Sequence, residues 1–304
     1  SLRVFFQTIS GSDEKVIRKL ISCIDSFYEE LKLKNIDYSC KNPIDFPTLS
    51  DLKVYLEKEV FELENSIYHS DMPEIKYKLM EEEYKETKEA LMIINEIVKS
   101  YGKMFDGHST LDLKNSKFTI FDFSAMSSSG GAESKVFKAQ MINILNYCWQ
   151  VMDHIRSNNV DKTFDEATRI AFVIDEATNY ISTSYENRYI VKYFEQYIKR
   201  ARKYLAGFSL AGHLISDFFP DSNSELAESV KKILALTTYK FIYKQDMVQI
   251  DTLSSVFKKL LNDSLLEQIP RLERGQAVLL VENDSYVFEH FVSQAEIDLY
   301  SGGF

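Results

Sequence analysis

The chain has 304 residues, enough for one large domain or two smaller ones, and its 45% hydrophobic and 27% charged content is typical of a globular protein. The net charge of −10 argues against a basic nucleic-acid module, because residues 1–105 hold 15 basic and 20 acidic side chains and the remainder holds 21 and 26. No apolar run approaches the roughly 20 residues of a membrane span. Three widely spaced cysteines form neither a zinc spacing nor a disulfide framework, which fits a reducing cytoplasm: Cys23, Cys40 and Cys148.

Residues 12–101 carry the periodicity of helices. Ser12 is a candidate N-cap, and an apolar stripe follows it at helical spacing: Val16, Leu20, Ile24, Phe27 and Leu31. A second helix is predicted where Thr48-Leu49-Ser50-Asp51 resembles a capping box and Leu52, Leu56 and Leu63 follow on one face. A third long helix is predicted from about Glu74 to Tyr101, with Gly102 as the residue that ends it. Because strand patterns are scarce before residue 105, we predict an all-α subdomain over residues 1–104.

The remainder of the chain, residues 105–304, alternates strands with helices. This alternation predicts a mostly parallel α/β sheet. The predicted helices cover 134–156, 185–204, 225–234 and 248–261. The predicted strands cover 117–123, 170–174, 207–211, 239–243, 276–281 and 286–292, the last two as a hairpin.

Two adjacent carboxylates, Asp175 and Glu176, end the predicted strand Ile170–Ile174. Its short continuous apolar run predicts a strand buried on both faces of a parallel sheet, and such sheets bind ligands at the carboxyl ends of their strands. In P-loop NTPases a carboxylate at this place holds the Mg²⁺ shell, and a neighbouring acid can orient the attacking water. The same residues also suit a core strand that runs into a solvated helix start.

A phosphate-binding P-loop is absent from the sequence. The motif needs G-x-x-x-x-G-K-[ST], and Gly102-Lys103 lacks both the upstream glycine and the following hydroxyl residue. Either the chain is no P-loop enzyme, or its phosphate loop lies upstream of Ser1.

Six stretches in chain order favour the second interpretation. They are residues 12–31, 47–52 (PTLSDL), 105–110 (FDGHST), 121–124 (FDFS), 173–177 (VIDEA) and 200–204 (RARKY). In order and spacing they resemble the ATPases of conjugative type IV secretion systems, the VirB/TraC/TraE-type family within the HerA/FtsK superfamily. In that family the Walker A loop and its strand precede an all-α insertion. The resemblance therefore implies that residues 1–104 form this insertion and that residues 105–304 form a partial RecA-like ATPase domain, from the Walker B strand onward.

The resemblance also implies roles for individual residues. Asp175 and Glu176 match the Walker B acids, with Asp175 holding Mg²⁺ through water. A second group matches the family's R-x-R-K-Y motif, which contacts nucleotide across subunits: Arg200, Arg202 and Lys203. An arginine fork stabilises the charge of a transferring phosphoryl group. From the residues alone, a cationic helix end that complements the helix dipole explains the same group.

At two further places the match is weaker. The family has a Thr-Gln pair after a strand, where this chain has Gly212 and His213. We still expect His213 to approach the terminal phosphate, since His can donate one hydrogen bond as Gln does, although its charge varies with pH. Lys240, Lys244 and Gln245 match a K-x-x-x-K-Q strand end, and exposed edge lysines explain them equally well.

The function that the resemblance implies is that of an ATP-binding hydrolase that powers conjugative transfer of plasmid DNA or protein and assembly of the channel. Its cofactors would be ATP and Mg²⁺. Its partners would be other secretion components at the membrane channel and copies of the same chain, with a hexamer left open. Its location would be cytoplasmic and peripheral at the inner face of the cell membrane. DNA contact stays open, although the charge does not indicate it.

Two alternatives remain beside the secretion ATPase. A DNA-pumping coupling protein of the same superfamily is disfavoured, because such proteins usually carry membrane spans. A non-catalytic scaffold that docks on the channel would lack the upstream G-x-x-x-x-G-K-[ST]. Since the P-loop holds the phosphates, we expect residues 1–304 alone to bind ATP weakly and to hydrolyse it negligibly.

Overall fold

The computed structural model describes residues 2–33, 42–69, 73–108, 116–123, 126, 135–221, 225–257 and 260–300. The chain divides into two compact units, Ser1–Val151 and Met152–Phe304. This division falls inside helix α6 (Lys135–Asn158), whereas the sequence predicted a boundary at residue 104. The assignment of residues 1–104 and 105–304 to an insertion and an ATPase domain stays a prediction. Cys40 and three residues of the quoted stretches lie outside the described residues: Ser109, Thr110 and Ser124.

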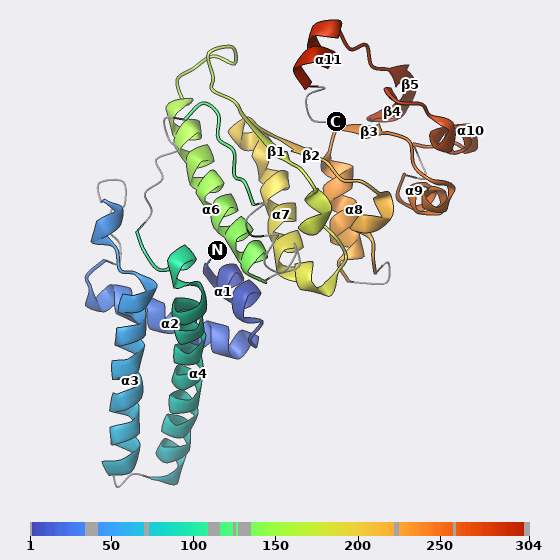
Figure 1. The fold of residues 1–304 in the computed structure, drawn as a ribbon. Helices are drawn as coiled ribbons and strands as arrows, with labels where there is room; N and C mark the ends of the chain where they lie inside the picture. Colours follow the sequence, from blue (N-terminus) through green and yellow to red (C-terminus); the bar gives the residue numbers. More distant parts are fainter. Residues whose placement is uncertain are drawn as a thin grey trace. The chain divides into compact units, whose positions relative to one another are not determined.

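The first unit is built from helices, as the periodicity predicted. They are α1 (Leu2–Ser10), α2 (Glu14–Glu30), η2 (Pro43–Asp45), α3 (Leu49–His69) and α4 (Glu74–Phe105), followed by the first part of α6. In Figure 1, α3 and α4 lie side by side as a long hairpin. The stripe on α2 forms part of the core: Leu20, Ile24 and Phe27 are buried, whereas Leu31 is 43% exposed at its margin. None of the helices in the described part of the chain is long and apolar enough to cross a membrane.

The predicted helix ends differ in detail from the structure. Because α2 begins at Glu14, Asp13 rather than Ser12 is its N-cap residue, and the Asp13 side chain makes no capping hydrogen bond. Gly102 lies inside α4, which bends at Tyr101 and continues to Phe105. Helix ends depend on tertiary contacts as well as on cap residues, so their positions are the least predictable feature.

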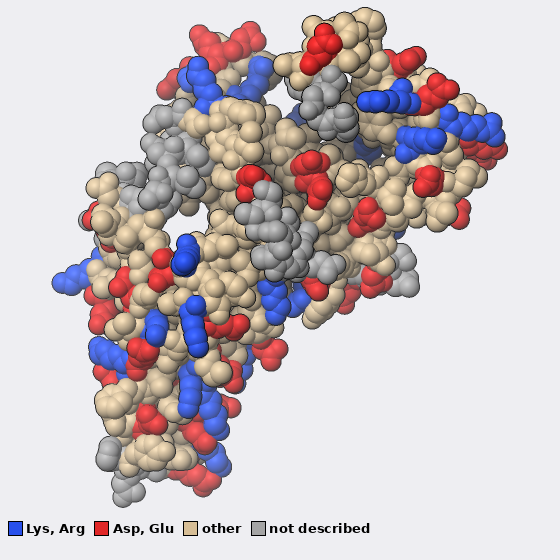
Figure 2. Space-filling model, in the orientation of Figure 1, with Lys and Arg blue, Asp and Glu red and all other residues tan. Residues whose placement is uncertain are grey.

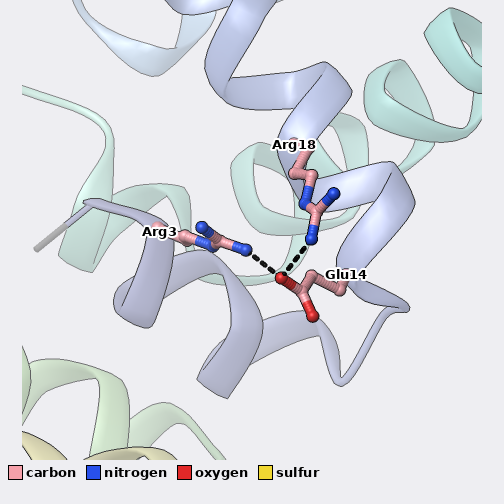
Figure 3. A network of polar contacts seen from close by, with 3 residues as sticks. All are labelled: Arg3, Glu14 and Arg18. Carbon is pink, nitrogen blue, oxygen red and sulfur yellow. Dashed lines mark hydrogen bonds and ion pairs between the residues drawn. The ribbon is translucent and has the colours of Figure 1, made fainter.

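A three-residue network fastens α1 to the first turn of α2 (Figure 3). Arg3 and Arg18 both donate to Oε1 of Glu14, with Arg18 Nη2 at 2.8 Å. The Arg18 hydrogen bond, with the charges of both guanidinium groups, holds the pKa of Glu14 below its ordinary value. Because these groups are exposed, the network orients the helices while apolar packing supplies most of the stability.

The surface of the α3–α4 hairpin carries both signs of charge. Lys and Arg are interspersed with Asp and Glu over this part of the view in Figure 2. Pairs one helical turn apart account for part of the pattern, such as Lys78–Glu74 at 2.6 Å and Lys85–Glu81 at 2.7 Å. This mixture is typical of a solvated helix surface rather than of a basic stripe that follows a nucleic-acid backbone.

The strand predicted over residues 117–123 is wrong. These residues form neither a helix nor a strand in the described part of the chain, and Phe118 and Ile120 are 81% and 75% exposed. The sequence has a strand pattern, but a strand also needs a hydrogen-bonding neighbour.

The second unit contains one parallel strand pair, β1 (Ile170–Ile174) and β2 (Ala206–Leu210), joined through α7 (Arg188–Ala201). The predicted bounds of β1 are confirmed. The prediction that β1 is buried on both faces of a parallel sheet is wrong, because β1 pairs only with β2 among the described residues. Its side chains alternate in exposure, and Val173 is 77% exposed.

A separate antiparallel sheet follows, in the order β3 (Tyr239–Ile242), β4 (Gln276–Val281) and β5 (Asp284–Glu289). One face of β4 packs Val278 and Leu280 into a core with the neighbouring helices. The described helices here are α8 (Ala227–Leu236), α9 (Ile250–Phe257), α10 (Asp263–Gln268) and α11 (Gln294–Tyr300). The hairpin is confirmed, but the chain is a helix-rich α/β protein, and its described residues form one small parallel pair rather than a mostly parallel sheet. The RecA-like core stays a prediction.

Candidate functional site

The parallel pairing of β1 and β2 brings two predicted site segments together. Ile174 pairs with Leu210, the last residue of each strand, so both chains leave the sheet at the same edge. Beyond the strands, Ala211 N donates to Ile174 O at 3.0 Å and Ala177 N donates to Ala211 O at 2.7 Å. Asp175 and Glu176 therefore lie beside Gly212 and His213.

The two carboxylates lie on a strained turn. Glu176 has φ 47° and ψ 43°, a left-handed conformation that costs a residue with a side chain roughly 1–2 kcal/mol. Its N–H donates to Oδ1 of Asp175 at 2.9 Å, and Asn179 Nδ2 donates to its Oε2 at 3.0 Å. Both acids are exposed. Strain of this kind concentrates at functional sites, and the turn presents two oriented, solvent-accessible carboxylates.

Sequence reasoning missed Asn179. It lies at the end of η3 (Ala177–Asn179), one turn of a short helix after Glu176, and this spacing was its only signal in the sequence. Nearby, burial raises the pKa of the Tyr180 hydroxyl, and the charge of Glu176 adds to the effect. Tyr180 therefore keeps its proton at neutral pH.

Gly212 lets the two turns approach closely. A Cβ atom at this position would lie 3.0 Å from Cε2 of Phe218 and 3.1 Å from Cγ2 of Thr178. The family has Thr where this chain has Gly212, and the close approach explains the difference. Any larger residue here would push the Thr178 turn or the Phe218 ring away.

The end of β3 reaches the same edge through Gln245. Its Nε2 donates to the carbonyl of His213 at 3.1 Å, and its Oε1 accepts from Ile215 N at a long 3.4 Å. Gln249, which sequence reasoning missed, is buried and accepts from Ser216 N at 3.1 Å. The two glutamines hold the His213 loop by its backbone, so the His213 side chain itself stays exposed.

Lys240 and Lys244 are placed differently. Lys240 Nζ donates to the carbonyl of Thr237, which precedes β3, at 2.5 Å, and burial lowers the Lys240 pKa. Its ammonium group is thus held at the opposite end of the strand from Gln245. Lys244 is exposed next to Gln245, with its carbonyl accepting a hydrogen bond from Gln245 Nε2 at 3.2 Å.

The structure places the predicted arginine group away from the acid pair. Arg200 is near the end of α7, and Arg202 and Lys203 lie in η5 (Arg202–Tyr204), which leads into β2. The carbonyl of Leu205 accepts from Ile170 N at 3.2 Å, which locates η5 at the amino ends of the strands. Because α7 has 14 residues and is about 21 Å long, these cations and the acids occupy opposite edges of the β1–β2 pair.

No three His, Cys, Asp or Glu side chains converge on a metal position in the described part of the chain. At this edge, the Asp175 carboxylate would hold a Mg²⁺ ion through water, with phosphate oxygens and further water completing the shell. Mg²⁺ is bound in this way in nucleotide-hydrolysing sites.

Two comparisons with known proteins bear on this arrangement. The structure is similar to that of VirB4 of Thermoanaerobacter pseudethanolicus, with a TM-score of 0.76 and 16% identity over 97% of this chain and 69% of that one. The sequence is 24% identical, over 96% of its length, to the uncharacterised Bacillus anthracis protein pXO2-09. This chain spans 45% of the length of that relative. No family model matches the sequence. The resemblance predicted from the sequence is confirmed: the chain is VirB4-like in its fold.

Proposed function

We propose that the chain is part of a VirB4-type ATPase, in which Asp175 and Glu176 serve ATP hydrolysis for a conjugative type IV secretion system. One observation carries the proposal. The parallel register of β1 and β2 brings the acid pair and the His213 loop together at the carboxyl ends of the two strands. Gln245 joins them there through its hydrogen bond to the His213 carbonyl. Open α/β sheets bind nucleotides at such an edge.

In this proposal each acid has its own task. Asp175 holds Mg²⁺ through water, and Glu176 orients the attacking water, with Asn179 fixing its carboxylate. His213 approaches the terminal phosphate from the adjoining loop. Lys244 and Gln245 line the same edge, whereas the place of Lys240 favours a structural role.

The phosphate loop would come from outside residues 1–304. Among the described residues, β2 pairs only with β1 and β3 pairs only with β4, so each presents one unpaired edge. A further strand that pairs with the free side of β2 or of β3 would bring a P-loop to the carboxyl ends of the strands. There the backbone N–H groups and the lysine of the P-loop would hold the phosphates.

The arginine group would act on a neighbouring copy. The cations of this group lie at the amino ends of β1 and β2: Arg200, Arg202 and Lys203. The acids of the same chain lie at the carboxyl ends. A head-to-tail contact between two copies would bring these cations to the nucleotide of the next copy. Repeated heterologous contacts of this kind form a ring when the rotation between copies closes. ATP, further copies of the chain and other secretion components are thus the proposed partners, at the inner face of the membrane.

The test is phosphate release and nucleotide binding by the full-length protein. Glu176→Gln should lower turnover by about 100-fold or more while binding is retained, because the amide keeps the shape but cannot act as a base. Glu282→Gln is the matched control, since Glu282 is also exposed and has φ 53°. It should behave as the parent does.

Three outcomes would count against the proposal. Turnover that survives Glu176→Gln would show that the active site is elsewhere. Turnover by residues 1–304 alone equal to that of the full-length protein would show that no outside phosphate loop is needed. A full-length protein that binds no ATP would instead be the scaffold. In the same assay, parental turnover of both His213→Ala and His213→Gln would exclude His213 as a sensor.

A further inference from the structure

Arg156 has a contact that its sequence position does not suggest. It lies near the end of α6, and its guanidinium carbon is 5.0 Å from the centroid of the Tyr204 ring. Tyr204 closes η5, the turn that begins with Arg202 and Lys203. The contact therefore joins a cation from a second helix to the predicted arginine group.

The contact with Tyr204 is a cation–π contact and not a hydrogen bond. It therefore does not use the five N–H donors of the Arg156 guanidinium. Arg156 is exposed and Tyr204 is partly buried, so the ring is a fixed support for a group that faces solvent. A restrained fork loses less conformational entropy when it binds a planar or tetrahedral anion.

Three cations at this edge form no ion pair within the described part of the chain. Over the described residues, none of Arg156, Arg202 and Lys203 forms an ion pair with a carboxylate. Lys199, one turn earlier, is different because it pairs with Glu195 at 2.5 Å. The dipole of α7 favours cations at its end, but it does not explain why Arg156 of α6 contacts the Tyr204 ring beside them.

We propose that Arg156 is a fourth cation of the arginine group and contacts the phosphates of the nucleotide bound to a neighbouring copy of the chain. The inference rests on the proposed function, which supplies the anion and the head-to-tail contact. Tyr204 is a positioning residue: it holds the Arg156 fork next to Arg202.

The first measurement is ATP turnover by the assembled full-length protein. Arg156→Ala should lower kcat by about 10-fold or more, since each lost 1.4 kcal/mol of transition-state stabilisation is tenfold in rate. Arg156→Lys keeps the charge without the fork and should be intermediate. Tyr204→Leu removes the ring and should impair turnover only when Arg156 is present.

Lys192→Ala is the control for loss of an exposed cation, because Lys192 is exposed in the middle of α7. It should leave turnover unchanged. If Arg156→Ala lowers the melting temperature, Arg156→Gln replaces it, since Gln keeps part of the side chain. Parental turnover of the folded Arg156 variants would overturn the inference.

The second measurement tests action across subunits. Glu176→Gln and Arg156→Ala chains are co-expressed to form mixed assemblies. A site that takes its acid from one chain and its arginine from the other is intact, so about a quarter of the sites should regain activity in a random mixture. A structural defect within the Arg156→Ala chain would not be rescued in this way, and absence of rescue would overturn the inference.

A parallel mixture of Glu176→Gln with Arg202→Ala separates the two proposals. Failure of this mixture to recover activity would count against the head-to-tail function itself. Recovery with Arg202→Ala but not with Arg156→Ala would leave the proposed function in place and reject only the role of Arg156.

Discussion

At the scale of single residues, Gly212 occupies a position that has no room for a side chain. A Cβ atom there would approach Phe218 and Thr178 to 3.0–3.1 Å. Gly212→Ala should therefore lower the free energy of unfolding by about 1–2 kcal/mol, as overpacking does. Gly207→Ala is the control, because a Cβ atom at Gly207 meets nothing within 4 Å. Denaturant unfolding measures both, and equal effects would contradict the steric argument.

Cys148 should give the protein a measurable loss of stability at alkaline pH. Burial raises its pKa to about 11, whereas an exposed thiol has a pKa of about 8.5. The folded state therefore keeps a proton that the unfolded state loses. Between about pH 8.5 and 11 the free energy of unfolding should fall by up to ~1.4 kcal/mol per pH unit from this group.

The measurement is urea unfolding at pH 7, 8.5 and 10 of the parent and of Cys148→Ala. The variant should lose less stability between pH 8.5 and 10 than the parent does. Tyr55, whose pKa burial raises to about 12, adds a loss of the same sign at higher pH in both proteins. Identical pH profiles would show that Cys148 is not protected in the folded state.

At the scale of elements, α4 shows how one helix divides its apolar residues between core and surface. Ile94 is fully buried and Met92 is 64% exposed, two positions away on the same helix. Ile94→Ala should cost about 2–5 kcal/mol through lost burial and a cavity. Met92→Ala should stay within about 0.5 kcal/mol, as surface changes usually do. Comparable losses for the two variants in thermal unfolding would mean that α4 packs by its other face.

At the scale of the whole molecule, the direction of the chain separates acids from arginines. β1 and β2 are parallel, so α7 must carry the chain from their carboxyl edge back to their amino edge. Asp175 and Glu176 follow a strand, and Arg202 and Lys203 precede one, so the connectivity alone puts them on opposite edges. This separation of Arg202 and Lys203 from the acids of the same chain is the physical basis of the head-to-tail proposal.

The sequence by itself determined the features that local chemistry decides. Helical periodicity located α2, α3 and α4, and a short apolar run between polar residues located β1 to the residue. The sequence also identified the acid pair, because Asp175 and Glu176 are adjacent to each other and directly follow the strand. The order and spacing of six short motifs between residues 12 and 204 was enough to indicate the VirB4-like fold.

Only the tertiary structure decided which elements meet. The exposed face of β1, and the absence of a strand over residues 117–123 in the described part of the chain, depend on which strands are neighbours. No local pattern encodes a hydrogen-bonding partner far along the chain. The same reason hid the contacts of Gln245 with His213 and of Arg156 with Tyr204, which join residues 32 and 48 positions apart. Side-chain identity is a property of the sequence, but proximity between distant residues is a property of the packed chain.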